Sequence, residues 1–220
     1  MLGYIKGEKY SLAVDAGASG RHTRDFYEGA EELGLKKPDF TVITHWHWDH
    51  TFGMEAAAGI TIAHKKTNEK LKEMMEWEWT DEAMKQRLIE GLDIEFADTY
   101  IRKEFPDLSE IKIVASDIIL EKNMVIDLGG ITAEIYHSEA SHSEDTLLIL
   151  IPERKVLFIG DAIGVDYYNN CALYSDKYQE LIKNIETLDF NICVMGHCDP
   201  VSKKELLKEM KDILERGGEE

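Results

Sequence analysis

The sequence has no long apolar run and very few cysteines. None of its apolar segments approaches the ~18 consecutive residues that a membrane-spanning helix needs. Its three cysteines are too few and too scattered for a disulfide framework. The N-terminal segment lacks a charged lead followed by an apolar stretch, so no signal peptide is predicted. We therefore expect a cytoplasmic protein that does not enter a membrane.

Positive charge is also scarce. The chain has 43 acidic and only 25 basic residues, which gives a formal net charge of -18. Because such a field repels phosphate backbones and anionic membrane surfaces, nucleic acid and membranes are not expected as partners. The acidic residues are spread along the chain, as is typical of a solvated surface. A small-molecule substrate is the partner we expect.

Strand and helix patterns alternate along the chain and predict a layered α/β fold. Strands are predicted at residues 3–6, 10–14, 40–44, 60–63, 111–115, 118–120, 124–127, 131–136, 146–151, 156–159 and 191–195. Helices are predicted at residues 22–34, 51–58, 176–188 and 203–216. The length suits one sizeable core, so we predict a single domain over residues 1–220.

Residues 65–105 differ from the rest of the chain. They are charged, contain methionine and tryptophan, and mostly follow a helical period, which predicts a helical insert. Four of their side chains either pack the insert against the body, which we favour, or line an apolar entrance beneath a lid. These are Met74, Met75, Trp77 and Trp79.

The densest group of metal-binding side chains is His45-Trp46-His47-Trp48-Asp49-His50. Alternation in an extended segment places His45 and His47 on one side, where they can share an ion. Asp49 and His50 follow as the chain turns, so they can face a neighbouring ion. A lone histidine is usually structural, but this density is poorly explained by packing because each buried imidazole needs a partner. For the two intervening tryptophans we favour core packing over substrate contact.

Further ligand candidates follow other predicted strands. Asp161 and His197 directly follow two strand-and-glycine segments, and a third strand leads through a short loop to His142. Strand ends can collect such residues at one sheet edge and leave a metal accessible. The seven candidates are too many for one catalytic tetrahedral ion and suit two ions that share a carboxylate. Nitrogen and oxygen donors favour Zn²⁺, with iron or manganese as alternatives.

These motifs together resemble the metallo-β-lactamase superfamily. Residues 44–50 match its His-x-His-x-Asp-His signature, and Asp15-x-Gly17 resembles its Asp-x-Gly loop. Residues 142–147 and 155–161 resemble the next two ligand motifs, and Gly196-His197 resembles the last. The resemblance implies an αββα sandwich with a dinuclear metal site at one edge of the two sheets.

The resemblance also implies a role for each ligand. One metal would be held by His45, His47 and His142, and the other by Asp49, His50 and His197. Asp161 would bridge them.

Three other histidines lie outside this assignment. His137 competes with His142, which we prefer because the segment from it to Asp161 fits the family hairpin without an insertion. His64 is interpreted as structural and His22 as a contact in the cleft.

The chain departs from the family in two places. Ser141-His142-Ser143-Glu144-Asp145 replaces the usual Gly-His-x-Pro-Gly, so the loop turns differently, and Ser143 or Asp145 could support the ligands. The chain also begins almost at the Asp-x-Gly hairpin, where the family normally has preceding strand material. A smaller sheet, a late assigned start or pairing with a second subunit would account for this, and the last allows a homodimer.

The predicted activity is hydrolysis by a hydroxide that bridges two ions about 3.5–4 Å apart. Asp49 is the predicted catalytic residue, orienting the hydroxide or accepting its proton. A small ester-like substrate such as a thioester or lactone suits an acidic cytoplasmic enzyme. The alternatives are a phosphodiesterase and an iron-dependent oxidoreductase of the same fold, either a persulfide dioxygenase or a diiron enzyme.

Overall fold

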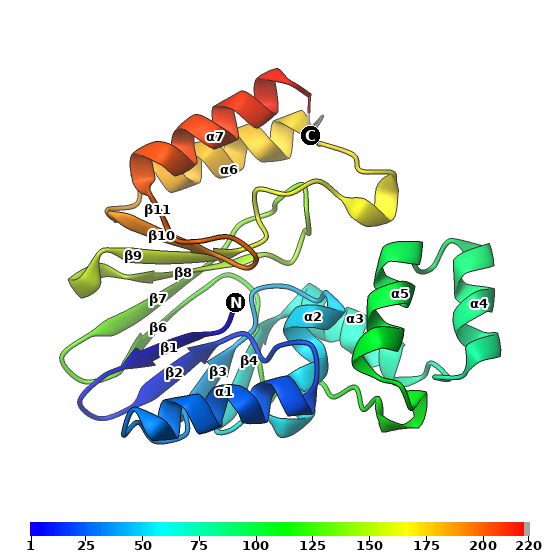
Figure 1. Cartoon of the computed structure of the whole chain (residues 1–220). Coiled ribbons are helices and arrows are strands. Elements are labelled where there is room, and N and C mark those ends of the chain that lie inside the picture. Colours follow the sequence, from blue (N-terminus) through cyan, green and yellow to red (C-terminus); the bar gives the residue numbers. More distant parts are fainter. Residues whose placement is uncertain (218–220) are drawn as a thin grey trace.

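Two β-sheets lie face to face in the computed structural model, with helices on their outer faces (Figure 1). The structure describes residues 1–217. Within that range, no helix is both long enough and apolar enough to cross a lipid bilayer.

The first sheet is built mainly from parallel strands. Its order is β1 (Gly3–Lys6), β2 (Ser11–Val14), β3 (Phe40–Val42), β4 (Ile60–His64) and β5 (Ile118–Leu120). β1 and β2 form an antiparallel hairpin, and the other neighbours are parallel. Parallel neighbours end at the same edge, so the loops after them meet there.

The second sheet is mainly antiparallel. Its order is β11 (Val201–Ser202), β10 (Ile192–Met195), β9 (Val156–Gly160), β8 (Leu147–Ile151), β7 (Thr132–His137) and β6 (Asn123–Asp127). β9 and β10 are its one parallel pair among the described residues, which brings the loops after both strands to one edge.

Strand β8 explains why the sheets stack. All five of its residues are apolar and buried. Leu147, Ile149 and Ile151 belong to the core between the sheets, while Leu148 and Leu150 belong to the core beneath the outer helices. Because side chains alternate along a strand, an unbroken apolar run is buried on both faces.

Helices cover both outer faces. The first sheet carries α1 (Gly20–Glu32), α2 (Trp48–Thr51), the 3₁₀ turn Phe52–Ala56 and α3 (Lys65–Met75). The second carries α6 (Ser175–Thr187) and α7 (Lys203–Glu215) (Figure 1). The predicted αββα sandwich is confirmed.

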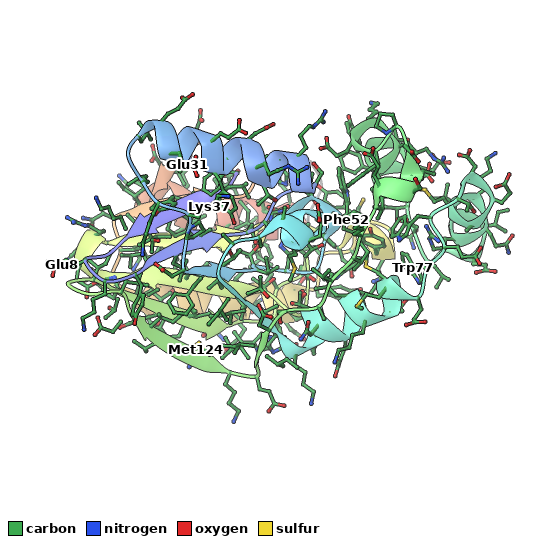
Figure 2. All side chains as sticks on the ribbon, turned by 90° about the horizontal axis from the view of Figure 1, so that it is seen from below. Glu8, Glu31, Lys37, Phe52, Trp77 and Met124 are labelled. Atoms are coloured by element: carbon green, nitrogen blue, oxygen red, sulfur yellow. The ribbon has the colours of Figure 1, made fainter. Side chains whose placement is uncertain are left out.

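The predicted helical insert is also present. After α3, the chain forms α4 (Asp81–Glu90) and α5 (Glu95–Glu104), which lie beyond α3 at the side of the sandwich (Figure 1). Figure 2 shows Phe52 and Trp77 at the junction between this insert and the body. Met74 is buried in the insert's apolar cluster, and Trp77 and Trp79 pack against it, whereas Met75 is half exposed. Packing is therefore the role of three of the four residues.

Two local predictions are wrong. Residues 111–115 form no strand. Ile111 and Ile113 pack into the apolar cluster of the insert, so this segment does not lie beside a strand of either sheet. The predicted helix 51–58 is two short turns, α2 and the following 3₁₀ segment, so the helical backbone begins at Trp48, inside the histidine motif.

Candidate metal centre

The histidine motif leaves β3 and turns at once into α2. His45 and His47 lie on the extended part of the loop, and Asp49 and His50 lie within α2. The Thr51 hydroxyl donates to the carbonyls of Trp46 and His47 at 3.1 and 3.0 Å, which fixes the turn. Because the backbone changes from extended to helical, the side chains of His45 and His47 take a different direction from those of Asp49 and His50.

The first cluster contains His45, His47 and His142, all buried. His45 Nε2 lies 3.1 Å from His47 Nδ1 and 3.3 Å from His142 Nε2. Burial lowers the pKa of all three imidazoles, and neighbouring imidazoles lower it further. The cluster is therefore neutral and presents nitrogen donors to one point.

The second cluster contains Asp49, His50, Asp161 and His197. His197 Nε2 lies 2.9 Å from Asp49 Oδ2 and 3.2 Å from Asp161 Oδ2. His50 Nε2 lies 3.4 Å from Asp49 Oδ2 and 3.5 Å from Asp161 Oδ2. Asp161 Oδ2 is also 3.7 Å from His142 Nε2, so this one oxygen faces both clusters.

Three ligand histidines hydrogen-bond through Nδ1, the ring nitrogen that faces away from the site. In a neutral ring the proton then lies on Nδ1, and Nε2 carries none. His142 Nδ1 donates to the Val165 carbonyl at 3.0 Å, and His50 Nδ1 donates to Asp15 at 2.8 Å. The Thr44 hydroxyl gives its proton to Asp15, so it accepts from His45 Nδ1 at 3.1 Å. His45 and His142 therefore turn a bare Nε2 toward the site, as metal ligation requires. Burial works to lower the pKa of His50, but the Asp15, Asp161 and Asp49 carboxylates raise it, so a bound metal ion would take the place of its Nε2 proton.

The charges of the second cluster favour a cation. Burial works to raise the pKa of Asp49, but the hydrogen bond from His197 and the charge of His50 lower it to about 2. Burial likewise opposes ionisation of Asp161, yet contacts with His197 and His50 hold its pKa well below the usual range. Hydrogen bonds to Asp161 and Asp49 raise the pKa of His197 to about 9.

Two buried atoms of this cluster have no hydrogen-bond partner among the described residues. They are His50 Nε2 and Asp161 Oδ1. Buried polar atoms are normally paired, and an orphan beside other donors indicates an ion or ligand. The donor set, the tautomers and these two atoms all fit divalent metal ions.

Asp15 holds the second cluster in place. It has φ of 63°, lies at the end of β2 and is 3% exposed. One oxygen accepts the Thr44 backbone N–H at 2.7 Å, and the other accepts the Thr44 hydroxyl and His50 Nδ1. The Asp-x-Gly motif identified this residue, but the motif alone did not reveal its contact with His50.

Asp145 connects three ligand-bearing segments. Its buried carboxylate accepts hydrogen bonds from the hydroxyls of Thr67, at 2.7 Å, and Ser143. The Trp46 backbone N–H donates to it as well, and burial raises its pKa. The carboxylate therefore joins the loop of His142 to the histidine motif and to α3. This is the support for the ligands that the sequence suggested for Ser143 or Asp145.

The remaining histidines lie apart from the two clusters. His64 Nδ1 accepts the Lys66 N–H at the start of α3, and its ring stacks on His137 at 3.8 Å. His137 Nε2 lies 2.9 Å from the Glu144 carbonyl oxygen. His22 is exposed in the first turn of α1, where its Nδ1 accepts the Ala18 N–H. None of these rings joins the seven converging residues.

A pocket of about 400 Å³ opens beside the first cluster. His47 and His142 form part of its wall, together with Trp46 and Tyr168. Its polar lining includes Lys66, Lys70, Lys177, Glu144, Asp145 and Asp166. Trp46 thus faces this pocket as well as packing against the insert. Another pocket, lined by the start of α4 and by the segment at and after the end of α5, has no candidate ligand in its wall.

Tyr168 links the insert to the ligands, a connection that the sequence did not indicate. Its ring centroid lies 4.8 Å from that of Trp46 and 5.3 Å from that of His47. Its hydroxyl points at Asp93, between α4 and α5, at 3.4 Å, and burial together with the Asp93 charge raises the pKa of Tyr168. The pairing depends on chain folding, and no motif surrounds either residue.

Known proteins resemble this chain in sequence or in fold. The human protein Acyl-coenzyme A thioesterase MBLAC2 is 19% identical over 232 residues, covering 97% of this chain and 78% of that protein. A metallo-beta-lactamase from Pontibacter korlensis superposes with a TM-score of 0.65 at 17% identity, over 96% of this chain and 85% of its own.

An archaeal relative has a similar structure. The metallo-beta-lactamase superfamily protein ST1585 from Sulfolobus tokodaii superposes with a TM-score of 0.61 at 21% identity, over 97% of this chain and 79% of its own. At such identities the superpositions show a shared fold. The family model described as the metallo-beta-lactamase superfamily matches residues 3–197. The chain therefore belongs to the metallo-beta-lactamase superfamily of metal-dependent hydrolases.

Proposed function

We propose that this chain is a dinuclear hydrolase that prefers zinc and cleaves a small ester-like substrate, a thioester or a lactone. The observation that carries the proposal is the position of Asp161 Oδ2. It lies 3.7 Å from His142 Nε2 in the first cluster and 3.2 Å from His197 Nε2 in the second. One carboxylate can therefore serve two adjacent ions.

The residues divide naturally between two ions. One would be held by His45, His47 and His142, the other by Asp49, His50 and His197, with Asp161 shared. When bound, divalent ions supply a hydroxide nucleophile at neutral pH and polarise the oxygen of the acyl group.

Asp49 is suited to proton transfer. Its side chain is 24% exposed and is ionised near neutral pH, so it can orient the attacking water as well as act as a weak base. It would accept the proton of the attacking water as the bond to the acyl carbon forms. When the bond to the leaving sulfur or oxygen breaks, the same proton would pass to that atom.

The substrate class has one support beyond the site. The human relative, named as an acyl-coenzyme A thioesterase, matches 97% of this chain, which favours a thioester over a phosphodiester. The pocket beside His47 and His142 adds polar and aromatic side chains for the rest of the molecule.

Metal analysis and turnover on the same sample test the proposal. Protein purified without chelator or added metal should contain two zinc ions per chain and hydrolyse simple thioesters or lactones. Chelation should abolish hydrolysis, and zinc should restore it. Predominant iron without esterase activity would support the oxidoreductase instead, and cleavage of phosphodiesters alone would support the phosphodiesterase.

A cytoplasmic location and a homodimer are part of the proposal. The homodimer would use the open edge of β1, the outermost strand of the first sheet. Light scattering at several concentrations distinguishes a dimer from a monomer.

A further inference from the structure

We infer that three aromatic side chains bind the apolar acyl arm of the substrate, an inference that rests on the proposed ester hydrolysis. They are Tyr167, Phe96 and Tyr100, here called the aromatic track. Tyr167 follows β9 in the loop after Asp161, and the other two lie on α5 of the insert. The track thus joins the metal edge of the sandwich to the insert.

The track begins at a candidate ligand. The Tyr167 ring centroid lies 5.8 Å from that of His142, with the rings almost perpendicular. Phe96 stacks on Tyr167 at 6.5 Å with an interplanar angle of 16°, and Tyr100 follows Phe96 at 4.7 Å. A continuous aromatic surface therefore runs outward from the first cluster.

These rings are partly open to solvent. Phe96 is 64% exposed, Tyr100 43% and Tyr167 42%. The opposite face of α5 packs the insert through Ala97 and Ile101, each 2% exposed. Exposed apolar side chains grouped beside a polar site are typical of a binding surface.

The surroundings favour the acyl arm as the occupant. An ester has two arms, and the neighbouring pocket is lined by Lys66, Lys70 and Lys177, which suit a polar or charged arm. The track lies outside that pocket, carries no formal charge and starts at His142, so an alkyl chain placed there keeps its carbonyl near the ligands. Lys103 Nζ lies 4.2 Å from the Tyr100 ring centroid and covers the outer end of the track.

Chain-length dependence tests the inference. We would load the protein with zinc and measure kcat/KM for N-acetylcysteamine thioesters from acetyl to decanoyl. A methylene on a surface open on one side should raise kcat/KM about twofold. In the double variant Phe96→Ser/Tyr100→Ser, the decanoyl-to-acetyl ratio should fall at least about tenfold.

A matched control addresses surface hydrophobicity in general. Ile89 lies on α4 of the same insert, is 79% exposed and has no part in the track. Ile89→Ser should keep the wild-type ratio of decanoyl to acetyl turnover. Thermal unfolding of all three proteins checks that the insert is folded.

Binding of a non-hydrolysable ligand separates the track from the chemistry. The S-decyl thioether of N-acetylcysteamine, measured by calorimetry on the zinc-loaded protein, should bind the double variant roughly tenfold more weakly. If no ester is cleaved but the thioether still distinguishes the variants, ester hydrolysis fails and the apolar ligand site stands. Unchanged thioether affinity and chain-length dependence in the double variant would overturn the track. A dimer that the double variant abolishes, with thioether affinity unchanged, would assign the rings to a subunit interface and overturn it too.

Discussion

The two halves of the metal centre differ in burial and in charge. The first half-site, His45, His47 and His142, consists of neutral imidazoles that are at most 7% exposed. The second, Asp49, His50 and His197, includes a carboxylate, and its His197 side chain is 59% exposed. Asp161 Oδ2 lies 3.7 Å from His142 Nε2 in the first half-site and 3.2 Å from His197 Nε2 in the second.

This difference has a consequence for the two ions. An ion in the first half-site would be surrounded by rigid, buried loops, whereas an ion in the second would face solvent on the His197 side. We therefore expect tighter binding in the first half-site and faster exchange in the second. Asp49, the proposed proton-transfer residue, lies in the more open half.

Removing the shared carboxylate should have the largest effect. In Asp161→Ala both half-sites lose a ligand, so activity should fall by more than about a hundredfold, because even changes to groups behind metal ligands cost 10–100-fold. Elemental analysis should find less than one tightly held ion per chain. Asp189→Ala is the control, since that side chain is 81% exposed and pairs only with Lys155 on the surface. Full metal content in Asp161→Ala would contradict a bridging role.

Single-histidine variants should separate the half-sites. His142→Ala removes a buried ring and its hydrogen bond to Val165, so it should lose an ion and destabilise the fold by about 1–3 kcal/mol. His197→Ala should lose an ion but destabilise the metal-free protein less than His142→Ala does, because the His197 side chain is mostly exposed. Chemical denaturation with and without chelator measures both. Equal losses of stability would contradict the proposed asymmetry.

Asp15→Asn should weaken the second half-site alone. The amide keeps the shape of the carboxylate but removes the charge that holds His50 Nδ1, so metal affinity there should fall about 10–100-fold. Zinc titration against a chelating dye should resolve one weakened and one unchanged ion. Weakening of both ions would mean that Asp15 supports the whole histidine loop.

The loss of stability of the metal-free protein in acid is the smallest of these effects. Burial and the charge of His137 lower the pKa of His64 to about 4, against 6.5 for a free imidazole. The unfolded state therefore takes up the proton first, and the contribution of neutral His64 is complete above pH 6.5 and lost as the pH falls toward 4. This contribution is at most about 3 kcal/mol.

His64→Asn tests this contribution of His64. Asparagine can still accept the Lys66 N–H at the start of α3, but it does not titrate. The variant should lose less stability than the wild type between pH 6.5 and pH 4, measured by urea denaturation of the metal-free proteins. If the variant loses as much stability as the wild type between these pH values, the loss would be assigned to the ligand histidines instead.

Much of the site followed from local patterns. A strand followed by three histidines and an aspartate within six residues predicted a cluster, and the later strand ends contributed Asp161 and His197. The structure brings all seven candidates together. The alternation of the apolar residues also predicted most strands, because a buried strand needs a periodic apolar face.

Residues 111–115 show where such patterns fail. Their apolar side chains are buried as the pattern predicts, yet no backbone partner lies beside them, and a strand requires pairing as well as burial. Asp145 was named only as an alternative to Ser143, and Tyr168 was missed, for a related reason. Each acts through contacts with residues far away in the chain, Thr67 for one and Asp93 for the other.

The sequence by itself determined the donor types, their order and the layered fold, since these depend on residue chemistry and on the period of apolar side chains. Tertiary structure alone decided which nitrogen His45, His50 and His142 present, because Thr44, Asp15 and the Val165 carbonyl occupy the opposite nitrogens. It also decided that one half-site is buried and the other open. That difference arises because the loop of His142 packs with α6 through Ala140, while the side chain of His197, which follows β10, is 59% exposed.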